Sequence, residues 1–112
     1  MDSTRQNKVS RLLQKELGEI FQRESRNLFG GAFITVTLVR VSPDMGVAKV
    51  YLSLFAVKDK TEMMDKIKAE KKEVRKLLAL RIKKQVRIIP ELDFILDDSL
   101  DYAEKIDQLL KK

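Results

Sequence analysis

The 112-residue sequence contains no cysteine and no histidine. These absences exclude disulfide bonds, cysteine nucleophiles, histidine-based catalytic triads, and metal sites made from thiolates or imidazoles. A chain without cysteine also fits a reducing cytoplasm, which is where we expect this protein to act. Any catalysis would therefore have to depend on carboxylates, lysines or hydroxyl groups.

Long apolar runs and phosphate-binding glycine motifs are also missing. No 18 consecutive residues are apolar and the start MDSTRQNKV has no apolar core, so we expect no membrane association and no secretory signal. Neither GxxxxGK[ST] nor GxGxxG occurs. The adjacent acids Asp97 and Asp98 predict the end of a strand and a helix cap rather than a magnesium site, because strand neighbours point to opposite faces. We therefore expect that the protein is not an enzyme. It should have no catalytic or metal-binding residue, no cofactor and no small-molecule substrate.

The balance of charge is basic and uneven. The net charge is +6 and the isoelectric point is about 9.6, which favours a polyanionic partner. Residues 1–90 hold 20 basic and 10 acidic side chains, whereas residues 91–112 hold 3 and 7. With 44% hydrophobic residues, the chain has the composition of one globular domain spanning 1–112. Tryptophan is absent and aromatics make up 6%. The chain therefore has few aromatic rings for a sheet surface that binds RNA by stacking many bases.

The first half of the chain predicts a helix followed by a β-hairpin. Ser3 and Gln6 match a capping box, and apolar residues at helical spacing predict a helix over residues 4–27 that Gly30-Gly31 ends. Alternating apolar residues predict one strand around 34–41 and another around 50–54, joined by a turn at 43–46. The apolar parity changes at Val39, which predicts a bulge or burial on both faces.

The second half predicts helical segments, a third strand and a last helix. Asp59 or Thr61 caps a helical pattern that runs to about Val86, as one helix or as two with a bend. Pro90 marks a boundary, and residues 92–96 alternate as a strand whose acids return to solvent. Asp98 or Ser99 then begins a helix with five inward-facing apolar residues: Leu100, Ala103, Ile106, Leu109 and Leu110. This order predicts an α+β sandwich with helices on one face of the sheet, in which the third strand can lie parallel to one hairpin strand.

The densest positive charge lies in residues 71–87, KKEVRKLLALRIKKQVR, with eight basic residues and one acid. On a continuous helix, Lys72, Lys76, Lys83 and Arg87 would lie within about 60° of one another, opposite the apolar side. The expected first helix carries a second basic stripe. Such stripes suit the regularly spaced phosphates of a nucleic acid, whatever its bases. The alternatives are a solvated surface, a protein-interaction module for an acidic partner, or a DNA-binding module.

Three stretches of the chain resemble the ribosome-binding factor A family. They are RQNKVSRLLQKELGEIFQRE at 5–24, ITVTLVRVSPDMGVAKVYLSLF at 34–55, and VRKLLALRIKKQVRIIPELDFILDDSL at 74–100, with RIIPELDFILDDS at 87–99 the strongest. The resemblance implies a type II KH-like fold, α-β-β-α-α-β, with a terminal helix. It also implies a non-catalytic cytoplasmic factor that binds free 30S subunits, assists late 30S assembly and 16S rRNA maturation, and matters most in the cold. We expect the protein to act as a monomer.

One departure from the family concerns the bend between the central helices. The family has a helix-kink-helix carrying Ala-x-Gly where other KH domains have a GxxG loop. That motif aligns with Glu70-Lys71-Lys72, so both the alanine and the glycine are missing here. We expect the RNA-binding residues to be the basic side chains of the two stripes and their margins: Arg5, Lys8, Arg11, Lys15, Lys71, Lys72, Arg75, Lys76, Lys83, Lys84 and Arg87.

Overall fold

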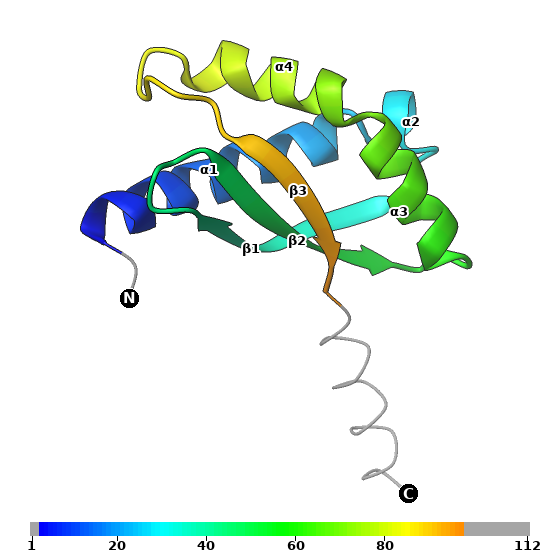
Figure 1. Ribbon diagram of the computed structural model, residues 1–112. Helices are drawn as coiled ribbons and strands as arrows, with labels where there is room; N and C mark the ends of the chain where they lie inside the picture. Colours follow the sequence, from blue (N-terminus) through cyan, green and yellow to red (C-terminus); the bar gives the residue numbers. More distant parts are fainter. Residues whose placement is uncertain (1–2, 98–112) are drawn as a thin grey trace, which may run out of the picture.

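The computed structural model describes residues 3–97, so the helix expected after Asp98 lies outside the described residues. The elements in chain order are α1 (Thr4–Arg23), α2 (Ser25–Leu28), β1 (Phe33–Val41), β2 (Val47–Phe55), α3 (Lys60–Ala69), α4 (Lys71–Ile82) and β3 (Glu91–Leu96). They form a three-stranded sheet with α1 and α4 packed together on one side (Figure 1). Both the α+β class and the KH-like order α-β-β-α-α-β are confirmed.

Helix α1 begins where the capping box predicts. The Ser3 hydroxyl accepts from the Gln6 amide at 3.1 Å, and the Gln6 side chain accepts from the Ser3 amide at 2.9 Å. The expected single helix over 4–27 is wrong, because Glu24 (φ −92°, ψ 6°) leaves helical geometry and separates α1 from α2. Gly30 and Gly31 then take φ values of 60° and 83°, which glycine adopts without strain. These two residues end the helical region as predicted.

The sheet has β2 at its centre, antiparallel to β1 and parallel to β3, as the helical crossover predicted. Between Val36 and Leu38 the register of β1 shifts by a bulge, at the point where the apolar parity changes. Leu38 is therefore 42% exposed, while Val39 and Val41 turn into the core. Because of the bulge, the buried residues are even-numbered in the first half of β1 and odd-numbered in the second half.

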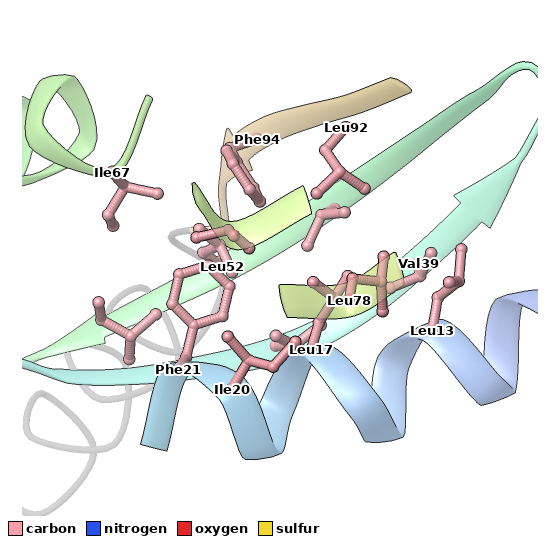
Figure 2. Packing of buried hydrophobic residues seen from close by; sticks show 14 of the residues in the cluster. Leu13, Leu17, Ile20, Phe21, Val39, Leu52, Ile67, Leu78, Leu92 and Phe94 are labelled. Carbon is pink, nitrogen blue, oxygen red and sulfur yellow. The ribbon is translucent and has the colours of Figure 1, made fainter. Parts of the chain in front are cut away.

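The core lies between the sheet and the helices. The Phe21 ring is fully buried and contacts two other rings, with centroids 5.3 Å from Phe29 and 5.8 Å from Phe94. Figure 2 shows Phe21 and Leu17 of α1 pointing toward Leu52 of β2 and Phe94 of β3. These contacts fix α1 on the sheet, and α1 carries several of the basic side chains singled out above.

The helical stretch after β2 consists of two helices with a bend at Glu70. Of the two capping alternatives, the Asp59 carboxylate accepts from the Glu62 amide at 3.0 Å. Glu70 (φ −94°, ψ 12°) joins α3 to α4, so the bend forms without the family's glycine. Helix α4 ends at Ile82 rather than near Val86, so the single helical stripe ending at Arg87 is wrong. The β-branched residues Val86, Ile88 and Ile89 disfavour further helix, and the chain must turn back to enter β3.

The acidic side chains of β3 and the residue after it differ in their exposure to solvent. Glu91 and Asp93 are exposed, as expected. Asp97 is half-buried instead, because its carboxylate accepts from the Thr37 hydroxyl at 2.6 Å, at the bulge of β1. Residues 3–97 contain no cluster of three or more metal-ligating side chains, and no helix in that range is long and apolar enough to cross a membrane. Asp98, the other acid of the pair, lies outside the described residues.

Candidate nucleic-acid interface

Two adjoining hollows gather most of the predicted basic side chains. The first, here called the α4 hollow, has a volume of about 720 Å³ between α4 and the segment that leads into β3. The second, the turn hollow, has about 750 Å³ between the start of α1 and the β1–β2 turn. Arg87 and the 56%-exposed Ile88 line both, so the hollows meet at this segment. Together they form one extended, indented surface.

The α4 hollow holds the densest charge. Its basic lining side chains are Lys71, Lys72, Arg75, Lys76 and Arg87. The first four lie on the first two turns of α4, at the spacing that brings them to one side of a helix. Ala79 leaves the next turn unobstructed, as the sequence predicted. Glu91 is the acid on the rim, so cations outnumber acids.

Arg87 reaches the α4 hollow by a turn, not by helical periodicity. The amides of Gln85 and Val86 donate to the Ile82 carbonyl at 2.8 and 3.1 Å, which reverses the chain after α4. The segment then runs back beside α4, so Arg87 lines the same hollow as Lys72 and Lys76. The predicted grouping of these three residues is therefore present, although the helical reason given for it was wrong.

The turn hollow adds Arg5 and Lys8 from the first turns of α1, beside Arg87. Asp44 lies on its rim, and its carboxylate accepts from the Ser42 hydroxyl at 2.7 Å and the Gly46 amide at 2.9 Å. The bond from Ser42 is the main cause of a lowered pKa for Asp44, and the bond from Gly46 adds to it. The carboxylate therefore stays charged while its hydrogen bonds lie within the turn. Two of the four basic residues predicted on α1 thus join the α4 set.

The other predicted basic residues lie elsewhere. Lys83 and Lys84 are exposed at the turn after α4, outside both hollows, as is Arg11 on α1. Lys15 lines a separate hollow near β1. The sequence did not predict Ile88 as part of the surface, because that prediction considered only the basic side chains.

Arg75 has main-chain partners that the sequence could not predict. Its guanidinium donates from Nε to the Pro90 carbonyl at 3.1 Å and from Nη2 to the Ile89 carbonyl at 2.7 Å. Arg75 therefore ties α4 to the segment that carries Arg87. This geometry makes Arg75 a positioning residue for the hollow as well as part of its charge.

Replacing Arg75 by lysine distinguishes the positioning role of the Arg75 side chain from the contribution of its charge to binding. Lysine keeps the charge but cannot reproduce a fork to two carbonyls. We expect Arg75→Lys to lower RNA affinity several-fold, roughly as much as Arg75→Gln does. The free energy of unfolding should fall by about 1 kcal/mol in both variants. RNA titrations and urea unfolding of the two variants measure this. Affinity restored by lysine would instead make Arg75 a simple phosphate contact.

Helix α4 is connected to α1 by two ion pairs of Arg81 that the sequence did not indicate. Nη1 of Arg81 lies 2.6 Å from Glu16 Oε2 and 2.7 Å from Glu19 Oε2. The hydrogen bond from Arg81 is the main cause of a lowered pKa for Glu19, so this carboxylate stays ionised and paired. Arg81 is thus paired with acids, whereas the basic residues of the hollows form no ion pair within residues 3–97. The two ion pairs connect the helices that present the basic surface.

The fold and this surface define a KH-like domain with a basic, indented face of the kind that contacts nucleic-acid phosphates. The sequence model of the family described as ribosome-binding factor A matches residues 5–110. A ribosome-binding factor A from Cytophaga hutchinsonii is 55% identical over 112 residues, covering 100% of this chain and 84% of the relative. The chain therefore belongs to the ribosome-binding factor A family.

Structures of relatives share the fold of this chain. The crystal structure of ribosome-binding factor A from Thermus thermophilus superimposes with a TM-score of 0.68 at 23% identity, covering 81% of this chain and 94% of that one. A homology model of the Thermus thermophilus protein, fitted into a cryo-EM map of its complex with the 30S subunit, gives a TM-score of 0.60 at 27% identity. It covers 78% of this chain and 89% of that one. The family is named for binding, not for a reaction.

Proposed function

We propose that this protein binds the free 30S ribosomal subunit by placing the α4 hollow and the turn hollow against phosphates of 16S rRNA. The observation that carries the proposal is the convergence of seven predicted basic residues on two adjoining hollows: Arg5, Lys8, Lys71, Lys72, Arg75, Lys76 and Arg87. Family membership and the 30S complex of the Thermus thermophilus relative support the choice of partner.

Binding through this surface is non-catalytic. Phosphate contacts fix the position and orientation of a protein on RNA and carry no sequence information. Selectivity then comes from the shape of folded rRNA and from the neighbouring ribosomal surface. On this proposal the whole chain, 1–112, acts in the cytoplasm as a single RNA-binding domain and a monomer, without cofactor, and assists late 30S assembly and 16S rRNA processing, most of all in the cold.

Cosedimentation with ribosomal particles tests the proposal. Full-length protein is mixed with isolated small subunits, large subunits and intact ribosomes at about 0.1 M and about 0.5 M salt. We expect selective movement with small subunits that is lost at the higher salt, because phosphate contacts release counterions. Equal movement with every particle would mean general polyanion affinity. No movement at either salt would favour an acidic protein partner, and tighter binding to duplex DNA than to rRNA fragments would favour a DNA-binding module.

A further inference from the structure

The face of the sheet that points away from α1 and α4 is partly apolar, and we call it the open face. Core side chains alternate along each strand, so the side chains between them point to the open face. Leu38, Tyr51 and Ile95 are partners in the strand register and form an apolar row across all three strands. Leu38 is 42% exposed, and Val47, further back along β2, is 41% exposed. A contiguous apolar surface of this kind marks a place that another segment or molecule covers.

A charged row lies beside the apolar row on the open face. Arg40, Lys49 and Asp93 are register partners, one on each strand, and all three are exposed. The two cations face each other directly, which is unfavourable in a sheet when no acid compensates them. No ion pair holds Arg40 or Lys49 within residues 3–97. The open face therefore suits an occupant that has an apolar stripe flanked by acids.

The chain leaves β3 over this face. The Asp97 amide donates to the Leu52 carbonyl at 2.7 Å, so Asp97 continues the pairing with β2 and its side chain points, by alternation, to the open face. The Asp97 carboxylate accepts from the Thr37 hydroxyl of β1 at 2.6 Å. Because β2 lies between β1 and β3, this bond reaches across β2. The bond therefore directs the end of β3 over the open face.

Residues 98–112 match this face in length, charge and polarity. A helix over residues 99–110 would be about 18 Å long. The part of β2 that lies beside β3, residues 47–52, is also about 17 Å long. Residues 98–112 hold four acids and three lysines, and all four acids come before residue 108. On a helix, the apolar residues of the segment would share one side: Leu100, Ala103, Ile106, Leu109 and Leu110.

We propose that residues 98–112 form a helix that packs its apolar side on the open face of the same molecule. The chain turns back after Asp97, and the helix covers the apolar row and then Val47. Its acids lie beside the two cations of the charged row and compensate their charge. The basic hollows then remain the positive surface that is available to RNA. The proposal concerns a contact within one molecule, so it does not depend on the function proposed above.

The width of the sheet gives the direction of the helix. Within residues 3–97 the sheet has three strands only beside residues 47–52 of β2. A helix about 10 Å in diameter rests on two or three strands that lie about 4.8 Å apart. Toward Phe33 and Phe55 the sheet has two strands and ends three residues after Leu52, which is too short for this helix. The charged row also lies on the wide side.

Cysteine protection tests the proposal, because the natural chain contains no cysteine. In the full-length protein, the thiol of Ile106→Cys is expected to react with a water-soluble disulfide reagent roughly tenfold more slowly than that of Gln108→Cys, on the polar side of the same helix. Adding Leu38→Glu in the apolar row should raise the rate at position 106 to that at position 108. Phe33→Glu, an equal change on the open face outside the covered area, should leave the rate at position 106 slow.

Each other outcome overturns the proposal. Equal rates at positions 106 and 108 would mean that the segment does not cover the sheet. Protection that Phe33→Glu releases and Leu38→Glu does not would place the helix at the other end of the open face. Protection that rises with protein concentration would mean that a second copy covers the face. Protection that needs added small subunits would make the ribosome the occupant.

A measurement without substitutions gives an independent answer if a variant fails to fold. In the parent protein, nuclear Overhauser contacts are expected between the ring protons of Tyr51 and the methyl groups of Ala103 or Ile106. Contacts of these methyl groups with the rings of Phe33 and Phe55 instead, or with no ring of the open face, would contradict the proposal. Urea unfolding of the Leu38→Glu and Phe33→Glu variants checks that both remain folded.

Discussion

A protein in which Lys71, Lys72, Lys76 and Arg87 are all changed to glutamine is expected to lose roughly 100-fold to 1000-fold of its affinity for small-subunit RNA near 0.15 M salt. These four side chains line the α4 hollow, and no hydrogen bond or ion pair holds them within residues 3–97. Each one that faces a phosphate releases a counterion. The slope of log K against log salt should therefore flatten by roughly three to four units.

The matched control removes the same charge from another part of the surface. Lys49, Lys58, Lys66 and Lys68 lie on β2, on α3 and on the loop before it, and line neither basic hollow. Their glutamine variant has the same net charge as the α4-hollow variant but should keep most of the affinity and the salt slope. An equal loss in both variants would show that binding follows net charge alone, and that the hollows are not the interface. Unfolding curves check that both variants remain folded.

Phe21→Ala should lower the free energy of unfolding by about 3–5 kcal/mol, far more than any of the surface substitutions above. The ring is fully buried between Phe29 and Phe94, so its removal leaves a cavity where α1 meets the sheet. Small domains have about 5–15 kcal/mol of stability in total, so this variant loses a large part of it. Urea unfolding followed by circular dichroism measures the change in midpoint.

The same substitution at an exposed ring is the control for Phe21→Ala. Phe55 is 61% exposed, so Phe55→Ala creates no cavity and should cost about 0.5 kcal/mol or less. If both variants lost the same stability, the ring at position 21 would not be the contact that holds α1 on the sheet. The presentation of Arg5 and Lys8 by α1 would then have to depend on other contacts.

Local signals in the sequence predicted the starts of two helices and the end of the first helical region. The Ser3 and Gln6 capping box, the Asp59 cap and the paired glycines at 30–31 depend on residues at most three positions apart. The parity change in β1 predicted either a bulge or burial on both faces for the same reason, since alternation is visible within a few residues, and the structure has the bulge. Such features need no knowledge of the rest of the fold.

The candidate site was predicted less completely, because it depends on contacts between distant segments. Arg87 was grouped with Lys72 and Lys76 by assuming a helix that in fact ends at Ile82. The actual neighbours are brought together by a chain reversal, and Lys83, which the same assumption included, lies outside the hollow. The bonds from Arg75 to the carbonyls of residues 89 and 90 have no local signature. Helical periodicity predicts which residues share a face only as far as the helix continues.

The bend at Glu70 has a further consequence for how this fold can vary in sequence. Its backbone angles, φ −94° and ψ 12°, have a negative φ that residues other than glycine can adopt, so glycine is not required there. The two positions that follow are lysines, and both line the α4 hollow. One three-residue segment thus sets the angle between two helices and supplies the first charges of the binding surface. A search for glycine at the bend would therefore overlook chains built in this way.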